Sequence, residues 1–347
     1  MTEATNVSSP NTPTPHPVSA KPLLFPDDIQ FWYEIKRAFG ASSYGGSEFG
    51  EVLATASRVI SGDYDSWYAE WNATAERLAT EAAVQLVRGH RISARDGFLR
   101  ASTYHRVSEF FLHGKPSDAR ILSAYRKSVE CYEACAKLFD PPIEPVEIPY
   151  EHTTLPGYFH RVDNSGRKRP FLIIHSGFDG SAEEVHMDGA RAAVERGYNV
   201  LAFDGPGQFG PLHRENLTFR PDWEKVVTPV VDFATKLPGV DPSRIALMGI
   251  SLGGELAPRA AAFEKRISAL IANDGVYDYG AANFGPIPAA QRPAAEKAVM
   301  AKEAPEMDRM LEGVMKESPI AAWALTHGMF AMGAGSPRAY IAASLAY

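Results

Sequence analysis

The sequence predicts an α/β protein in which a helical segment precedes a parallel β-sheet. Four apolar runs between residues 169 and 275 each lead into a glycine-containing loop: "PFLIIHSGF", "YNVLAFDGPG", "RIALMGIS" and "ALIANDG". Helical patterns separate these runs, and apolar strands that alternate with helices are typical of a parallel sheet covered on both faces. Strand signals are scarce before residue 140, which predicts a separate helical region there.

The composition is that of a soluble globular protein, with 45% hydrophobic and 22% charged residues in 347. The net charge is -7 and the chain has no extended basic cluster, so we expect no nucleic-acid partner. Because no apolar run is long enough to span a bilayer and the start lacks a signal-like core, we expect no membrane association and a cytoplasmic location. Cys131 and Cys135 have no partners at metal-ligand spacing, and we expect them to be buried small hydrophobes.

The N-terminal part divides into a tail and a helical domain. Residues 1–20 are rich in Ser, Thr and Pro, which predicts a disordered tail. Residues 21–143 are predicted to form the helical domain, whose last two helices cover 91–113 and 117–139 around the breaker "GKPSD". The closely spaced prolines of "DPPIEPVEIPY" end it, since proline is incompatible with a helix interior.

Residues 144–279 are predicted to form the α/β core. Two short strands at 146–150 and 155–162 are expected first, followed by the four apolar strands with helices at 182–196, 222–237 and 252–265. Ligands of open α/β sheets bind beyond the carboxyl ends of the strands. We therefore expect one crevice to be lined by the residues at four strand ends, which are His175, Asp204, Ser251 and Asp274.

Ser251 is the candidate nucleophile. It is the centre of a G-x-S-x-G pattern between a predicted strand and a predicted helix, where Gly249 and Gly253 permit the sharp bend of a nucleophile elbow. The alternative is a serine that only caps the helix. For an oxyanion hole we expect the amide of Leu252 together with the amide of Phe178, or else that of Gly177, although these glycines could serve only a tight turn.

Two further loops have weaker signals. In "FDGPGQFG", residues 203–210, the prolines prevent a helix from opening directly, so we do not expect a nucleotide site there. Asp274 and Asp278 are placed either to meet a substrate or to brace their loop.

Several longer stretches resemble one group of α/β-hydrolases, including "EFFLHGKPSDARI", "VEIPYEHTTLPGYFHR", "NVLAFDGPGQ" and "IALMGISLGGELAPRAAAFEKR". This group contains the fungal polyketide-shortening hydrolases of yellowish-green pigment type, 2,6-dihydroxypseudooxynicotine hydrolase and FrsA-like proteins. The resemblance implies the α/β-hydrolase fold with an N-terminal helical domain, Ser251 as nucleophile, and no cofactor and no metal.

The resemblance also implies a helical lid, which we place at 280–335, with 336–347 starting the helix that returns to the core. Four lid side chains either line an apolar substrate pocket or pack internally: Trp323, Met329, Phe330 and Met332. His327 matches no motif, and we do not expect it to be the general base.

The implied activity is C–C bond hydrolysis of a polyketide-like or acylated aromatic ketone in secondary metabolism, without metal or cofactor. The alternatives are a carboxylesterase acting on small esters and a non-catalytic hydrolase-like binding protein. No position matches the acid and histidine that the resemblance implies, so we expect a sheet truncated at the C-terminus, and a chain that is inactive and poorly soluble. A small-molecule partner is expected, and a homodimer is left open.

Overall fold

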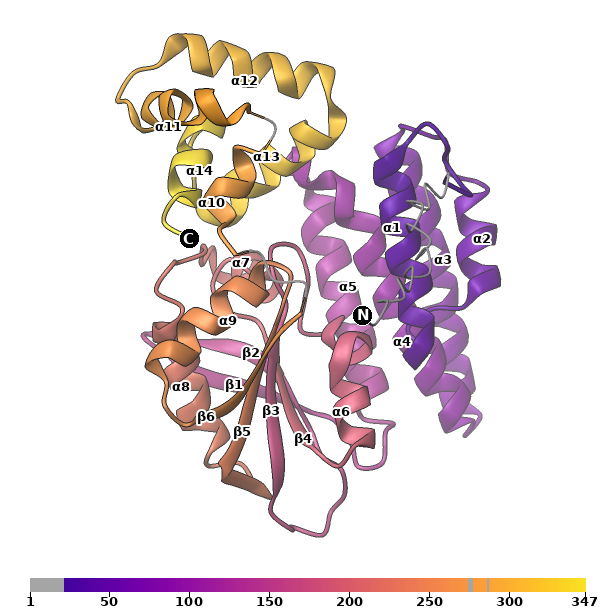
Figure 1. The fold of residues 1–347 in the computed structure, drawn as a ribbon. Coiled ribbons are helices and arrows are strands. Elements are labelled where there is room, and N and C mark those ends of the chain that lie inside the picture. Colours follow the sequence, from indigo (N-terminus) through magenta and orange to yellow (C-terminus); the bar gives the residue numbers. More distant parts are fainter. Residues whose placement is uncertain (1–21, 274–276, 286) are drawn as a thin grey trace, which may run out of the picture.

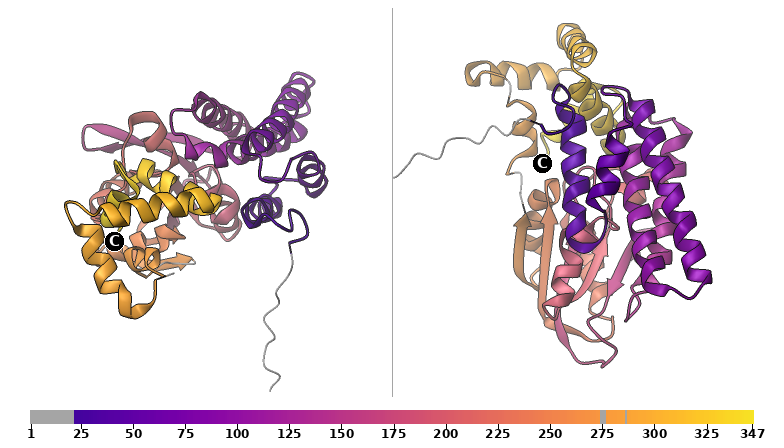
Figure 2. Two further views of the ribbon diagram at one scale, coloured as in Figure 1. Left: turned by 90° about the horizontal axis from the view of Figure 1, so that it is seen from above. Right: turned by 90° about the vertical axis from the view of Figure 1, so that its right-hand side faces the viewer.

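The computed structural model describes residues 22–273, 277–285 and 287–347 (Figure 1). The predicted tail at 1–20 and the strand-end residue Asp274 lie outside the described residues. Along the chain, N-terminal helices come first, then a sheet flanked by helices, and finally a group of helices beyond one end of the sheet (Figures 1 and 2).

The N-terminal helices pack around an aromatic core that includes Trp67 and Trp71, both fully buried. The side chains of Asp28, Asp63 and Asp118 cap three of the helices by accepting hydrogen bonds from first-turn N–H groups. The described residues before the sheet contain no strand. Their elements are α1 (Ile29–Gly40), α2 (Phe49–Ala56), α3 (Tyr64–Val87), α4 (Arg91–Glu109) and α5 (Ala119–Ala136), with 3-10 turns at Ala41–Tyr44 and Phe110–Gly114.

The helix predicted over 91–113 is therefore shorter than expected. The α-helical part ends at Glu109, and the chain tightens into the 3-10 turn Phe110–Gly114. Short 3-10 turns are common at the ends of α-helices.

The six-stranded sheet confirms the predicted α/β architecture. Its strands are β1 (Glu144–Tyr150), β2 (Thr153–His160), β3 (Arg169–His175), β4 (Asn199–Phe203), β5 (Val240–Ile250) and β6 (Ile267–Asn273), in the spatial order β1-β2-β4-β3-β5-β6. Strands β3 to β6 are parallel, whereas β2 pairs antiparallel with both β1 and β4. The edge strand β6 departs from the expectation that both faces are covered, because Leu270 and Ile271 are 41% and 46% exposed.

The helices between the strands are α6 (Arg191–Glu195), α7 (Phe209–Glu215), α8 (Glu224–Ala234) and α9 (Leu252–Phe263). The helix expected at 182–196 is wrong in length: regular turns begin as a π-helix at His186–Ala190 and continue as α6. Gly189 has non-helical backbone angles there, and a Cβ at this position would lie 2.9 Å from Cδ1 of Ile174 on β3. The backbone therefore passes so close to the sheet at this position that little room is left for a side chain.

The last group of helices lies beyond the carboxyl ends of the parallel strands (Figures 1 and 2). It comprises α10 (Tyr279–Asn283), α11 (Arg292–Met300), α12 (Pro305–Glu317), α13 (Pro319–Met332) and α14 (Pro337–Ser344), with a 3-10 turn at Ala289–Gln291. Four of these helices have proline in the first turn, where its missing N–H is not needed. None of the helices in the described part has both the length and the apolar character that a bilayer crossing requires.

Candidate functional site

Ser251 occupies a strained backbone conformation between β5 and α9. Its φ is 56° and its ψ is -127°, angles that non-glycine residues rarely adopt. The strain is held by hydrogen bonds on both sides: the Ser251 amide donates to the Asn273 carbonyl at 3.0 Å, and the Gly254 amide donates to the Ser251 carbonyl at 2.6 Å. Ser251 is exposed, so this sharp turn presents its hydroxyl to solvent at the carboxyl end of the sheet.

The glycines of the G-x-S-x-G pattern are required by close backbone contacts. A Cβ on Gly249 would lie 1.8 Å from the carbonyl oxygen of Gly253, and a Cβ on Gly253 would lie 2.3 Å from the carbonyl oxygen of Ser176. Neither contact leaves room for a side chain. The pattern thus encodes a sharp bend in which the strand and the helix are in close backbone contact, which is the geometry that the elbow interpretation predicted. The Ser251 side chain makes no cap hydrogen bond to α9, so it does not act as an ordinary helix cap.

The loop after β3 lies directly against this bend. A Cβ on Gly177 would lie 2.6 Å from the Ile250 carbonyl oxygen and 2.8 Å from the Leu252 amide nitrogen. The structure therefore brings the predicted oxyanion residues together, because Phe178 follows Gly177 and Leu252 begins α9. The amino end of α9 also carries the partial positive charge of the helix dipole, which favours an oxyanion at the same place.

Two of the residues predicted to line the crevice are buried and act structurally. His175 has no exposed surface; its Nδ1 lies 2.9 Å from the Ser176 carbonyl oxygen, and the indole N–H of Trp223 donates to its Nε2 at 3.3 Å. Burial lowers the pKa of His175 to about 4, which keeps the ring neutral. Asp204 is also buried and accepts a hydrogen bond from the Gly210 amide at 3.0 Å. Neither side chain is exposed, so of the three expected residues that the structure describes only Ser251 is accessible.

Other elements hold the Gly177–Phe178 loop in place, and the sequence did not indicate them. Arg106 of α4 donates to the carbonyl of Asp179, and Arg37 of α1 forms ion pairs with Asp179 at 3.3 Å and with Glu184 at 3.0 Å. In α13, Nε2 of His327 lies 3.0 Å from the carbonyl oxygen of Phe178. Side chains of the N-terminal helices and of α13 therefore both contact this loop.

The α13 side chains that could have lined a substrate pocket make packing contacts. Trp323 stacks on Phe110 with ring centroids 4.7 Å apart and donates its indole N–H to the Phe110 carbonyl at 2.8 Å. Met329, Phe330 and Met332 pack against the buried apolar clusters of the core and of α10–α14.

The side chains of His327 and Asp278 also have hydrogen-bond partners. Both ring nitrogens of His327 have partners, since Nδ1 lies 2.7 Å from Nδ1 of His113, and this leaves none to accept the Ser251 proton. Asp278 caps α10 by accepting a hydrogen bond from the Ala281 amide at 2.7 Å. Of the two roles considered for Asp278, the structure therefore favours bracing of its own segment.

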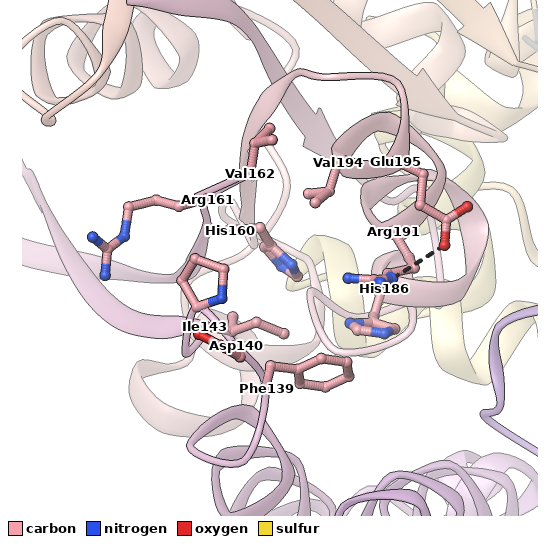
Figure 3. Close-up of a pocket in the computed structure, with 11 residues that line it drawn as sticks. Phe139, Asp140, Ile143, His160, Arg161, Val162, His186, Arg191, Val194 and Glu195 are labelled. Carbon is pink, nitrogen blue, oxygen red and sulfur yellow. Dashed lines mark ion pairs between the residues drawn. The ribbon is translucent and has the colours of Figure 1, made fainter. Parts of the chain in front are cut away.

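A cavity of about 200 Å³ lies elsewhere, lined by residues that include Asp140, His160, His186 and Arg191 (Figure 3). His160 pairs with Val200 at the start of β4, whereas Ser251 follows the carboxyl end of β5. The cavity is therefore at the opposite end of the sheet and does not belong to the candidate site.

Comparison with known proteins gives three kinds of match. Residues 171–344 match a family model described as "Alpha/beta hydrolase family". The chain is 40% identical over 275 residues to the hydrolase acrC of Aspergillus aculeatus, covering 74% of the chain and 63% of the relative. It is 41% identical over 269 residues to the 20-hydroxy-prefusarin hydrolase FUS2 of Gibberella moniliformis, covering 74% and 62%.

The chain thus spans slightly less than two thirds of the length of these curated relatives. Among solved structures, 2,6-dihydroxy-pseudo-oxynicotine hydrolase superposes with a TM-score of 0.67 at 22% identity, covering 88% of this chain and 75% of that one. This likeness extends beyond the sheet to the N-terminal helices and supports the fold.

Proposed function

The chain belongs to the α/β-hydrolase family, and from this premise we propose that it is a serine hydrolase in which Ser251 attacks a carbonyl carbon. The observation that carries the proposal is the backbone of Ser251, with φ 56° and ψ -127° at an exposed bend where the flanking glycines leave no space for side chains. Such strain persists where it serves a function, and here it presents a hydroxyl group beyond the carboxyl end of β5.

In the proposed mechanism Ser251 Oγ bonds to the carbonyl carbon and the carbonyl oxygen becomes an oxyanion. The amides of Leu252 and Phe178 donate hydrogen bonds to that oxyanion, aided by the amino end of α9. A histidine takes the Ser251 proton and returns it to the leaving group. Neither His175 nor His327 is this base, because both nitrogens of each ring are already engaged.

For the substrate we propose a polyketide-like or acylated aromatic ketone of secondary metabolism, of the pigment type, cleaved at a C–C bond. After Ser251 attack, the bond between the carbonyl carbon and its neighbour breaks, and the carbon fragment leaves as an enolate that takes up a proton. Water then hydrolyses the acyl-enzyme to a carboxylic acid. A β-dicarbonyl substrate makes this feasible without a metal, because its leaving carbanion is stabilised as the enolate.

Two features support this substrate class. One relative is named as a hydrolase of 20-hydroxy-prefusarin, and two others are named simply as hydrolases. In the structure, apolar side chains of α10–α14 pack close to Phe178: its ring lies 5.8 Å from that of Tyr279 and 6.5 Å from that of Tyr340. Aromatic rings packed beside the candidate oxyanion hole suit an acylated aromatic ketone.

The experiment is covalent labelling with a fluorophosphonate probe, followed by product analysis. We expect the protein to be labelled at Ser251 and Ser251→Ala to be unlabelled, whereas Ser243→Ala, which removes another exposed serine, keeps the label. Equal labelling of wild type and Ser251→Ala would overturn the nucleophile. Hydrolysis of p-nitrophenyl esters without shortening of an aromatic β-diketone would identify a carboxylesterase, and absence of any labelling would identify a non-catalytic binding protein.

A further inference from the structure

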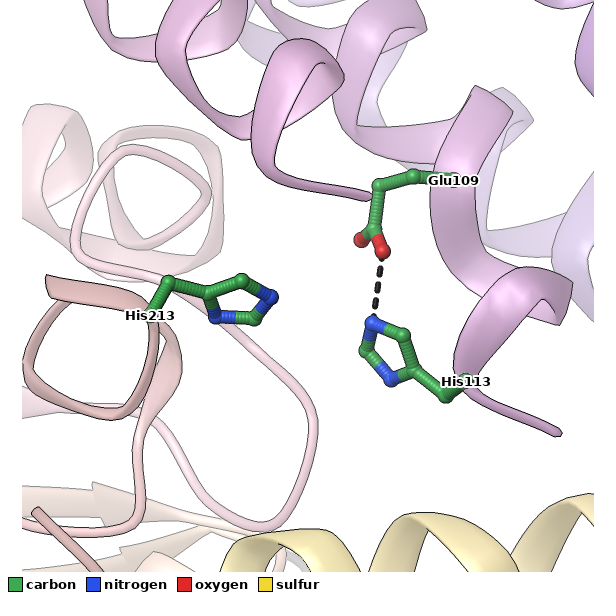
Figure 4. Close-up of side chains that lie close together, drawn as sticks. All are labelled: Glu109, His113 and His213. Atoms are coloured by element: carbon green, nitrogen blue, oxygen red, sulfur yellow. Dashed lines mark ion pairs between the residues drawn. The ribbon is translucent and has the colours of Figure 1, made fainter. Parts of the chain in front are cut away.

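Three side chains with metal-binding groups converge between the N-terminal helices and the core (Figure 4). Glu109 ends α4 and His113 follows four residues later in the 3-10 turn, so both lie on one side of that segment. His213 comes from α7, about a hundred residues further along the chain. One carboxylate oxygen and two imidazole nitrogens lie within 4.8 Å of one another.

The atoms that face one another are buried and lack a well-formed hydrogen bond. Among the described residues, His213 Nε2 has no hydrogen-bond partner, and Glu109 Oε2 and His113 Nε2 have only each other. Glu109 Oε2 and His113 Nε2 lie 2.6 Å apart, at ion-pair distance. The side chains of Glu109 and His113 are 0% and 1% exposed, so bulk solvent does not reach them. Buried polar atoms of this kind are rare without a reason.

The remaining polar atoms of these side chains have hydrogen-bond partners, and these partners orient the ligand atoms toward the middle of the cluster. His213 Nδ1 lies 2.8 Å from the carbonyl oxygen of Phe209, which only accepts, so Nδ1 carries the proton and Nε2 has a free lone pair. Arg106 donates to Glu109 Oε1 at 2.5 Å and leaves Oε2 facing the two histidines.

The same reasoning holds for His113. Because the Phe178 carbonyl only accepts, His327 Nε2 carries a proton, and His327 Nδ1 is then the acceptor in the neutral ring. His113 Nδ1, at 2.7 Å from it, is therefore the donor, and His113 Nε2 is directed at Glu109 Oε2, where a metal ion would take the place of the proton between them. Metal-bound histidines characteristically donate their second N–H in this way, which fixes the orientation of the ring.

The surrounding charges favour a cation. One connected set of ion pairs contains four carboxyl groups, two guanidinium groups and one imidazole, namely Glu34, Glu109, Asp179 and Glu184 against Arg37, Arg106 and His113. Burial raises the pKa of Glu34 to about 7, so this carboxyl group carries only part of a charge at neutral pH. A divalent ion bound by Glu109 would add positive charge to a set that holds more carboxyl groups than guanidinium groups.

We propose that Glu109, His113 and His213 bind one divalent transition-metal ion, with zinc as the best fit to two imidazoles and one carboxylate. Tetrahedral ligands of a zinc ion at 2.0–2.1 Å lie about 3.4 Å apart, so the 2.6 Å pair must open by about 0.8 Å and any pair near the 4.8 Å bound must close. The ion would join α4 to α7 and, through the His113–His327 contact, to α13. This site goes beyond the proposed function and is independent of Ser251 chemistry.

The experiment measures zinc in the untagged full chain by plasma mass spectrometry and titrates the chelator-treated chain with Zn²⁺ and with Co²⁺. We expect close to one zinc per chain, a thermal midpoint that rises on zinc addition, and visible absorption of bound Co²⁺. His213→Ala should bind at least about 100-fold more weakly, whereas the matched control His105→Gln should bind as wild type does. His105 is a buried histidine of α4, the helix that carries Glu109, and lies outside the cluster.

His213 is partly exposed, so its replacement should leave the fold intact, which circular dichroism of the metal-free chain checks. Two results would overturn the proposal. The first is a wild-type chain that binds zinc no more tightly than His213→Ala, which would leave Glu109 and His113 as an ordinary ion pair. The second is binding of one zinc ion per chain by His213→Ala as well as by His105→Gln, which would place the ion at another site. Neither result depends on hydrolase activity.

Discussion

Replacing Gly177 by alanine should disable the proposed oxyanion hole while Ser251 stays in place. In the structure, the added Cβ would lie 2.6 Å from the Ile250 carbonyl oxygen and 2.8 Å from the Leu252 amide nitrogen. Both contacts are with backbone, so no side-chain rotation can relieve them. Real Cβ contacts are essentially never shorter than 3.0 Å, so the Gly177–Phe178 loop and the bend at Ser251 must separate by at least about 0.4 Å.

The size of the effect follows from the narrow range of useful donor distances. Oxyanion-hole donors act at about 2.7–3.1 Å from the developing charge, so a shift of about 0.4 Å spans that whole range. Losing one donor costs about 10²- to 10³-fold in turnover. We therefore expect Gly177→Ala to lower the rate constant for fluorophosphonate labelling of Ser251, and kcat for ester hydrolysis, by about 10²-fold or more.

The assay compares labelling rates by intact-protein mass spectrometry, with thermal midpoints measured in parallel. Gly180→Ala is the matched control in the same loop, because its Cβ would meet the Ser176 hydroxyl, the end of a small side chain that can rotate away. The reasoning is refuted if Gly177→Ala reacts within threefold of wild type, or if Gly180→Ala loses as much reactivity.

Three further outcomes are expected. Ser251→Gly should raise the free energy of unfolding by about 1 kcal/mol relative to Ser251→Ala, since glycine accepts the strained angles, as urea denaturation would show. Trp323→Phe keeps the stack on Phe110 but removes the indole hydrogen bond to the Phe110 carbonyl; it should cost about 1 kcal/mol and speed amide exchange in α13. Burial lowers the pKa of His175 to about 4 and of His186 to about 3, so the unfolded chain binds more protons below pH 6.5. Stability should therefore fall as pH drops from 6.5 toward 4, by up to about 2 kcal/mol per histidine at pH 5, and less steeply in His186→Gln.

The sheet and the elbow could be predicted because their signals are local. Apolar runs that end in glycine loops identified β3 to β6, and G-x-S-x-G identified Ser251, since both features depend on residues adjacent in the chain. The interruption before α6 was not predicted, because Gly189 is constrained by contact with Ile174 on a different element. His175 was expected to line the crevice, but Trp223, 48 residues later, covers it.

The partners of the charged groups around the site could not be predicted from the sequence either. Glu109 and His113 carry a recognisable i, i+4 spacing, but their third partner, His213, joins them only through the packing of α7 against the N-terminal helices. Likewise, nothing near Phe178 in the sequence indicates that Arg106 and His327 hold its loop.

By itself, the sequence determined the α/β class, the position of the bend and its glycines, because strand periodicity and steric restrictions on the backbone act over a few residues. Only the tertiary structure decided which histidines are available, which loop lies against Leu252, and which acids and imidazoles share a buried cluster. Those outcomes depend on burial and on contacts between residues distant in the chain, and local sequence encodes neither the desolvation of a side chain nor its partner.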